Sequence, residues 1–298
     1  MIYNGKGAVV PPEILEAAKR DGVRLILVLG GVDTGKTTFT RVLASELAKK
    51  RSVAVVDADP GQSDIGPPTT IAWGHFPSAG AGKNFHWEDI KAEAIYFVGA
   101  TSPVGNLLPT ITGTKLISES ALLEAEKVIV DTSGLISGGP GQALKRHKID
   151  ILRPDMVVAL ERERELEYVA GHLKGRKGIA LYRLAEVPGV RVKSASERAE
   201  CRKQRFREYF REARDLRLSL GEVSLVKEEW LDLSRPGQIL NRLVSLRDDD
   251  GRDRALGIIE GTDEDSGGLT IYSPLGQEIK VVSIIPGKLR LTRAGEEL

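Results

Sequence analysis

The chain has 298 residues, of which 41% are hydrophobic and 29% charged, and its formal net charge at pH 7 is +1. This fits a soluble globular protein with two compact domains, or one large and one small, rather than a disordered chain, and it excludes a peptide hormone, a disulfide mini-protein and a fibre. No apolar stretch approaches the roughly 20 residues that cross a bilayer, and the N-terminus lacks a signal peptide. We therefore expect a cytoplasmic protein without membrane contact. Nine Asn and Gln against 85 Lys, Arg, Asp and Glu are typical of thermophilic proteins.

Short apolar, β-branched runs alternate with helical patterns through the first 220 residues. A helix candidate over 12–20 precedes the apolar run 23–29, which leads into a helical pattern ending near residue 50. Further strand candidates lie at 53–57, 95–98, 128–131, 156–160 and 179–184, with helical patterns at 106–125 and 163–173. Each run has the length of a strand buried on both faces. The alternation predicts an α/β fold with a mostly parallel sheet flanked by helices.

From about residue 222 the pattern changes to short strands cut by turn signals such as Asp250-Gly251 and Pro286-Gly287. Residues 221–298 hold 10 Lys and Arg against 15 Asp and Glu, so the basic surplus lies upstream. We predict three parts: a short N-terminal segment at 1–20, an α/β core at 21–220 and a small β domain at 221–298. The acidic β domain is a poor platform for nucleic acid, so we expect it to brace the core or shape one wall of a groove.

A phosphate-loop motif, G-x-x-x-x-G-K-[ST], follows the first strand of this core and opens the next helix. Its residues are Gly30, Gly31, Val32, Asp33, Thr34, Gly35, Lys36, Thr37 and Thr38. In such a loop the backbone amides surround phosphate oxygens, the lysine reaches the β- and γ-phosphates, and the Thr37 hydroxyl binds Mg²⁺. The motif predicts a nucleoside triphosphate site but does not say which acceptor takes the phosphate.

Carboxylates end two of the predicted strands. Asp57 and Asp59 follow the second strand, and Asp131 ends the strand at 128–131. Ligands of doubly wound sheets sit beyond the carboxyl ends of the strands, so we expect Asp57 and Asp59 to face the γ-phosphate. One of these two can bind the metal while the other accepts a proton, and Asp131 fits a carboxylate that holds Mg²⁺ through water. The alternative is an acidic strand end that only caps a loop.

Segment 191–217 contains ten Lys and Arg against five Asp and Glu. Ser194 and Glu197 form a capping-box pattern, which predicts a helix from 194 to about 218. At helical spacing three arginines share one stripe beside an apolar face: Arg198, Arg202 and Arg205. Three guanidinium groups on one stripe suit a phosphate ligand, so we interpret the helix as a lid over the transferring phosphoryl group. The alternative is a solvated helix with i,i+4 ion pairs.

Six motifs in the same order along about 190 residues resemble the polynucleotide 5'-hydroxyl kinases, the family of the kinase subunit of the mRNA 3'-end cleavage machinery and of the ribosomal-RNA-processing kinases. They are the phosphate loop, the Asp59-x-Gly61-Gln62 strand end, the segment from Thr101 to Asn106, the segment from Asp131 to Gly134, the Leu152-Arg153-Pro154-Asp155 turn, and the lid from Arg198 to Phe210. The resemblance implies transfer of the γ-phosphate of ATP to the 5'-hydroxyl of RNA or DNA.

This resemblance also implies roles for single residues. Lys36 and Thr37 bind ATP and Mg²⁺, Asp59 is the general base, and Gln62 orders the water of the metal. For the rest of the site, Thr101 and Asn106 hold the first phosphates of the substrate, Arg198 and Arg202 are the lid arginines, and Arg205 faces the substrate. Single-stranded RNA or DNA 5' ends are the expected partners, with RNA-processing proteins as further candidates.

The chain departs from the family pattern at two places. Leu135 stands where eukaryotic members carry an acceptor-side tryptophan, which leaves Phe85 or Trp87 as candidate aromatic supports, although a core role is the stronger expectation for either. Only about 20 residues precede the first strand, where larger members have a β domain.

Three other functions stay open at this point. They are a P-loop switch NTPase, a small-molecule kinase and an ATP-binding scaffold subunit without kinase activity. The arginine stripe has no use in a simple switch, and the intact Lys36 and Asp59 disfavour a scaffold. A small-molecule kinase would phosphorylate mononucleosides and oligonucleotides equally well.

Overall fold

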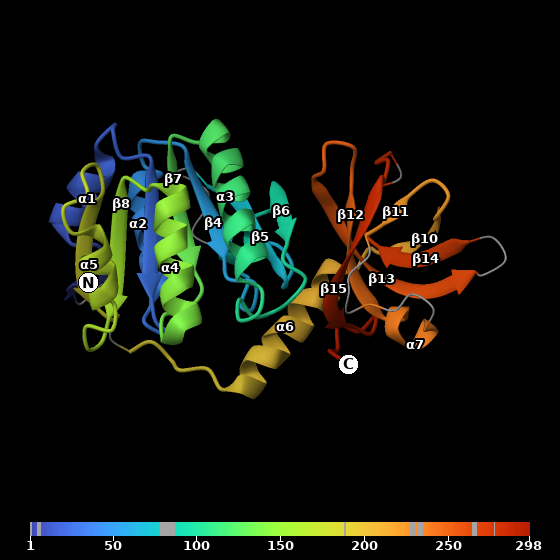
Figure 1. Cartoon of the computed structure of the whole chain (residues 1–298). Helices are drawn as coiled ribbons and strands as arrows, with labels where there is room; N and C mark the ends of the chain where they lie inside the picture. The colour runs from blue at the N-terminus through green and yellow to red at the C-terminus, as the bar shows by residue number, and fades with distance from the viewer. Residues whose placement is uncertain are drawn as a thin grey trace.

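A computed structural model describes residues 2–4, 7–77, 87–187, 189–226, 231, 235–263, 267–276 and 278–298. Its centre is a parallel sheet of five strands in the order β4-β7-β3-β8-β9 (Figure 1). The strands are β3 (Leu25–Gly30), β4 (Val53–Ala58), β7 (Lys127–Thr132), β8 (Met156–Glu161) and β9 (Ala180–Ala185). The prediction of a mostly parallel sheet is confirmed.

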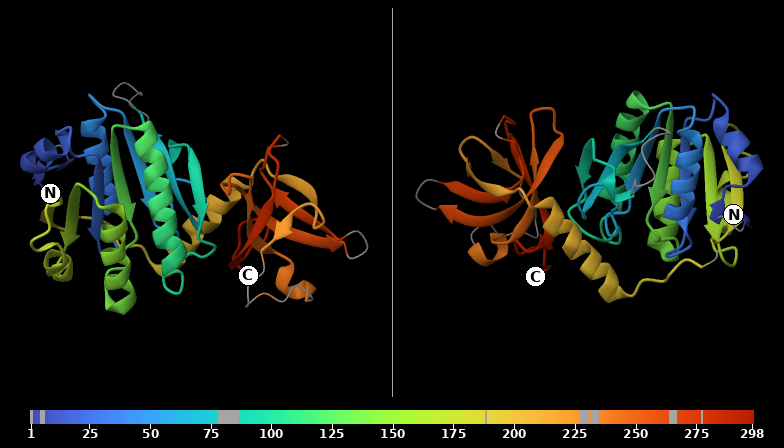
Figure 2. Two further views of the ribbon diagram at one scale, coloured as in Figure 1. Left: turned by 45° about the horizontal axis from the view of Figure 1, so that its top comes forward. Right: turned by 180° about the vertical axis from the view of Figure 1, so that it is seen from behind.

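Helices cover both faces of this sheet because successive strand residues point to opposite sides. In β3, Ile26 and Val28 pack with α1 (Pro12–Lys19) and α2 (Lys36–Leu47) on one face. On the other face, Leu27 and Leu29 pack with α3 (Leu107–Glu124), α4 (Gly138–Leu152) and α5 (Glu167–Leu173). Figure 2 shows α2 and α4 on opposite sides of the sheet. None of the described helices is long and apolar enough to cross a membrane.

Two antiparallel strands extend the sheet beyond β4. They are β5 (Thr70–Phe76) and β6 (Ala94–Phe97). The sequence analysis did not predict β5. At the opposite edge, β9 is partly exposed along its length, so the expectation that each strand is buried on both faces is wrong there. The short strands β1 (Ile2–Asn4) and β2 (Gly7–Val9) pair with each other near the N-terminus.

The C-terminal part is a mostly antiparallel sheet with its own apolar core. Its elements are β10 (Arg214–Ser219), β11 (Ser224–Leu225), α7 (Pro236–Ile239), β12 (Arg242–Arg247), β13 (Asp253–Asp263), β14 (Gly268–Ser273) and β15 (Ser283–Arg290). One pairing of β13 with β6, Asp253 to Ile95, joins this β domain to the core sheet. The Asp253 carboxylate strengthens the junction by accepting a hydrogen bond from the Phe97 amide at 2.7 Å.

The arginine-rich helix α6 (Ala195–Tyr209) connects the core to the β domain (Figure 1). Its predicted capping box is confirmed: the Ser194 hydroxyl accepts from the Glu197 amide, and the Glu197 carboxylate accepts from the Ser194 amide. The predicted end near residue 218 is wrong, because residues 214–219 alternate between their two faces and form β10, which pairs with β14. Phe206 and Phe210 pack in a cluster with apolar side chains of the β domain, which anchors the C-terminal half of the helix there.

Candidate active site

The phosphate loop joins β3 to α2 and takes its predicted form. Gly35 precedes the helix at φ 86°, a left-handed conformation that favours glycine, and a Cβ there would lie 2.3 Å from the Val187 side chain. Thr34 and Lys36 are buried, and the Lys36 ammonium donates a hydrogen bond to Gly31 O at 2.6 Å. Burial lowers the pKa of Lys36, while Asp131, Asp59 and Asp33 oppose that shift. The lysine therefore sits among carboxylates inside its own loop.

Thr37 and Asp131, the metal ligands that the sequence predicts, are in direct contact. The Thr37 hydroxyl donates to Asp131 Oδ2 at 2.6 Å, and burial raises the pKa of Asp131 to about 6. The second oxygen, Oδ1, is buried without a hydrogen-bond partner among the described residues. An orphaned carboxylate oxygen next to a threonine hydroxyl offers the hard oxygen ligands that Mg²⁺ prefers, so these residues fit the ion.

The two carboxylates at the end of β4 have different surroundings. Asp57 is buried and accepts hydrogen bonds from the amides of Asp59, Asp64 and Ile65, so it organises the turn that follows the strand. Asp59 is partly exposed, and its Oδ1 accepts from the amides of Gly61, at 2.9 Å, and Gln62, at 3.3 Å. Of the two carboxylates expected to face the γ-phosphate, Asp57 is therefore buried in the turn, whereas Asp59 stays partly exposed. The Gln62 side-chain amide donates to Gly61 O at 2.6 Å.

The predicted substrate loop lies directly against this turn. A Cβ on Gly61 would lie 2.3 Å from Thr101 O, so the Asp59 turn and the Thr101 backbone are in contact. At the other end of the loop, the Asn106 side-chain amide donates to Ser102 O at 3.0 Å and Val104 O at 3.2 Å. Asn106 thus closes the loop on itself and starts α3 as its N-cap.

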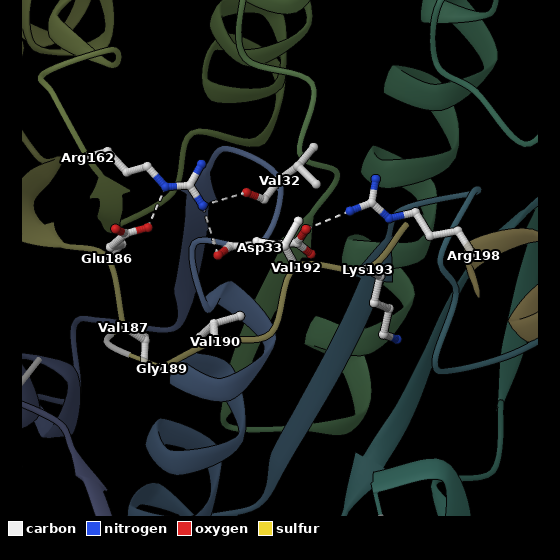
Figure 3. Close-up of a pocket in the computed structure, with 10 residues that line it drawn as sticks. All are labelled: Val32, Asp33, Arg162, Glu186, Val187, Gly189, Val190, Val192, Lys193 and Arg198. Carbon is white, nitrogen blue, oxygen red and sulfur yellow. Dashed lines mark hydrogen bonds and ion pairs between the residues drawn. The ribbon is translucent and has the colours of Figure 1, made fainter. Parts of the chain in front are cut away.

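Each arginine of the lid stripe has an acidic partner from a different part of the chain. Arg198 pairs with Asp33 of the phosphate loop at 2.6 Å (Figure 3), and Arg205 donates to Asp64 O at 3.0 Å in the turn after β4. Arg202 pairs with Glu297 near the C-terminus at 2.6 Å. The structure therefore places Arg198 against the phosphate loop and Arg205 against the turn after β4, whereas Arg202 is held by the C-terminal segment.

A pocket of about 550 Å³ opens beside the phosphate loop (Figure 3). It lies between the loop and the segment after β9, with the side chains of Val32, Val187 and Val190 on its wall. Arg162 donates to Val32 O at 3.1 Å and Asp33 O at 3.0 Å, and it also pairs with Glu186. Sequence reasoning missed this arginine, because it follows β8 in a segment without a recognisable motif.

The sequence also gave no indication of two buried lysines in α4 or of the contacts that Lys288 of the β domain makes with the core. Two fully buried lysines of α4, Lys145 and Lys148, lie behind the strand ends; their place in a helix gave no signal of burial.

From β15, the Lys288 amide donates to Gly99 O at 2.8 Å and its ammonium reaches Gly105 O at 3.3 Å. The β domain thus contacts the core at Gly99 and at Gly105, next to Asn106. Phe85 lies outside the described residues, and Trp87, in the short 3-10 helix η1 (Trp87–Asp89), is a core side chain, 2% exposed.

A parallel sheet with a phosphate loop after its first core strand, and carboxylates at two neighbouring strand ends, defines a P-loop nucleotide-binding protein. The family model described as mRNA cleavage and polyadenylation factor CLP1 P-loop matches residues 30–212. The chain belongs to this family.

Curated relatives and solved structures agree with this assignment. The chain is 32% identical to the polyribonucleotide 5'-hydroxyl-kinase of Methanocaldococcus jannaschii, with 92% of this chain and 88% of that protein covered. It is 30% identical to the corresponding kinase of Pyrococcus horikoshii, with 92% and 87% covered. Among solved structures, Clp1p in complex with Pcf11p superposes with a TM-score of 0.71 at 15% identity, covering 93% of this chain and 78% of that chain. This last similarity shows a shared fold.

Proposed function

We propose that the protein is an ATP-dependent polynucleotide 5'-hydroxyl kinase, which transfers the γ-phosphate of ATP to the 5'-hydroxyl end of RNA, and of DNA as well. The observation that carries this proposal is the contact between the Asp59 turn and the Thr101 loop, where Gly61 and Thr101 O meet. It sets a proton acceptor beside a loop suited to an acceptor strand, at the same sheet edge as the phosphate loop. The archaeal relatives are named for this activity.

The proposed reaction is an in-line displacement. Asp59 accepts the proton of the 5'-hydroxyl, whose oxygen forms a bond to the γ-phosphorus. The bond from that phosphorus to the bridging oxygen breaks, and ADP leaves with both electrons. Lys36 balances charge on the β- and γ-phosphates. Thr37 and Asp131, together with Asp59 and Gln62, would hold Mg²⁺, and the bound ion would neutralise charge on the phosphates.

The lid arginines exchange their present carboxylate partners for phosphate oxygens when ATP is bound. Arg198 is paired with the phosphate loop itself through Asp33, so a short side-chain movement suffices. Arg202 must leave Glu297, and Arg205 must leave the Asp64 segment. A guanidinium pairs with phosphate through two parallel hydrogen bonds, which favours the exchange. The nucleoside of ATP fits the pocket between Val32 and the segment after β9.

The acceptor is a single-stranded 5' end whose first phosphates lie on the loop with Thr101 and Asn106. The bracing contacts of β15 with this loop support a role for the β domain in shaping the acceptor groove. The divisions 1–20, 21–220 and 221–298 stay part of the proposal, and the pairing of β10 with β14 favours a β domain that begins near residue 214. We further propose a thermophilic, cytoplasmic enzyme of RNA processing or repair that works with RNA-processing proteins.

One assay tests this function. Purified protein is incubated with γ-labelled ATP and Mg²⁺ and, in parallel, with single-stranded RNA, single-stranded DNA, a duplex and a mononucleoside. We expect label on the 5' end of the single strands and little on the mononucleoside. Equal labelling of the mononucleoside would indicate a small-molecule kinase, and label found only as inorganic phosphate would indicate a switch NTPase. A Lys36→Met variant, with no transfer expected, controls for contaminating kinases.

A further inference from the structure

Helix α4 carries two lysines, Lys145 and Lys148, that are fully buried at the carboxyl ends of β4 and β7. Burying an ammonium group costs several kcal/mol unless hydrogen bonds and opposite charges compensate. Two hydrogen bonds compensate the burial of Lys145, whose Nζ donates to Ser133 O at 2.6 Å and to Thr132 Oγ1 at 3.0 Å. Within the described chain, Lys148 Nζ makes one long hydrogen bond, 3.3 Å to Ala58 O. Hydrogen bonding alone does not explain why Lys148 is buried.

Neighbouring carboxylates supply the missing compensation. The oxygen that Lys148 contacts lies in the backbone between Asp57 and Asp59, and both carboxylates interact electrostatically with the ammonium, as does Asp131. Burial lowers the pKa of Lys148 to about 8 while these carboxylates oppose the shift, so the amine is mostly protonated at pH 7. Conversely, burial and repulsion from Asp64, Asp131 and Asp59 raise the pKa of Asp57 well above its ordinary value. The strand ends therefore form an acidic cluster around Lys148, with Lys145 and Lys36 buried beside the same carboxylates.

We propose that Lys148 is a positioning residue for phosphoryl transfer: its buried ammonium is the fixed counter-charge that holds the Ala58–Asp59 backbone and the acidic strand ends in place before a divalent cation binds. Lys36 does not serve this purpose, because its ammonium belongs to the phosphate loop and binds the triphosphate in the proposed function. Lys148 lies on α4, outside that loop, and its ammonium contacts the end of β4. The catalytic part of this inference rests on the proposed function, since Asp59 acts as the base there.

Two consequences of this role can be measured independently. Removing the ammonium removes a positive charge that repels a divalent cation, so the free protein should bind Mn²⁺ more tightly. Coulomb interactions at a few ångströms predict an affinity gain of about tenfold. The same change loosens the Ala58–Asp59 backbone, so kcat should fall about 10- to 100-fold, since small misplacements of reacting groups are costly. The KM for ATP should change less than about threefold, because Lys148 does not contact the phosphate loop.

The experiment compares Lys148→Met, which keeps length and removes charge, with Lys148→Arg, which keeps the charge. Lys127→Met is the matched control, because Lys127 is also buried but binds Arg20 O and Val23 O at the opposite end of β7. Mn²⁺ affinity of the nucleotide-free protein is measured by calorimetry, kcat and KM by phosphate transfer, and Tm by calorimetry. Should Lys148→Met not fold, Lys148→Gln replaces it.

We expect tighter Mn²⁺ binding and a lower kcat in Lys148→Met, wild-type Mn²⁺ affinity in Lys148→Arg, and a lower Tm with unchanged kcat and affinity in Lys127→Met. Unchanged or weaker Mn²⁺ binding in folded Lys148→Met, or an unchanged kcat, would overturn the inference. If wild-type protein transfers no phosphate, the proposed function fails, and the Mn²⁺ measurement still decides whether Lys148 is the counter-charge.

Discussion

The close contact between Gly61 and Thr101 makes Gly61→Ala a sharp probe of the site. A Cβ at residue 61 would lie 2.3 Å from Thr101 O, about 1 Å inside an ordinary contact, and a backbone oxygen cannot rotate away. The Asp59 turn and the substrate loop must therefore separate by about 1 Å. Alanine keeps the amide that Asp59 Oδ1 accepts from, so the turn itself stays hydrogen-bonded.

A misplacement of this size costs about 100-fold in rate when it falls between reacting groups. We expect kcat for oligonucleotide phosphorylation to fall about 100-fold and the KM for ATP to stay within about threefold, with a stability loss of about 1–3 kcal/mol from overpacking. Steady-state kinetics with varied ATP, together with calorimetric Tm values, measure these effects. Gly139→Ala is the control, because a Cβ there meets nothing within 4 Å. A wild-type kcat in folded Gly61→Ala would refute the placement of the acceptor at this contact.

Three further predictions concern the nucleotide, the metal and the lid. Arg162→Ala removes hydrogen bonds to Val32 O and Asp33 O and should raise the KM for ATP about tenfold with little change in kcat; an unchanged KM would show that the loop holds its shape unaided. Because the pKa of Asp131 is raised to about 6, its proton competes with a cation below that pH, so Mn²⁺ affinity of the free protein should fall with pH below about 6 and be flat above 7. Calorimetry in Asp131→Asn should show weaker binding without this dependence, and an identical pH profile in the variant would assign the titration elsewhere. Arg202→Ala should lower kcat about 100-fold and affect the KM for ATP less, whereas Glu297→Gln, which removes only the charge of the present partner of Arg202, should leave kcat within about twofold. Equal kcat losses in the two variants would mean that the pair only fastens the C-terminal segment.

The core of the fold could be predicted because its signals are local. Three signals each specify a local structure within a few residues: the apolar run before Gly30, the phosphate-loop spacing and the Ser194–Glu197 capping box. The structure contains the strand, the loop before α2 and the helix start that these signals predict. Parallel strands that are buried on both faces also appear in the sequence as continuous apolar runs. These runs can be recognised as strands because helical patterns separate them.

Features that depend on distant partners could not be predicted. The apolar run inside β5 is only three residues long, Ile71 to Trp73, and the strand forms because β4 and β6 offer edges on both sides. The lid helix ends at Tyr209 because β14 pairs with the residues that follow, which helical spacing alone cannot reveal. The acidic partners of the lid arginines come from three separate segments, so their pairing is a property of the tertiary structure.

The central claim is that Asp59 takes a proton from a 5'-hydroxyl held on the Thr101 loop. Single-turnover transfer from γ-labelled ATP to a 5'-hydroxyl RNA oligonucleotide, compared between wild type and Asp59→Asn with ATP binding measured in both, tests it most directly. We predict 5'-end labelling by wild type and a rate at least about 100-fold lower in the variant, with ATP still bound. A wild-type rate in Asp59→Asn would contradict the claim.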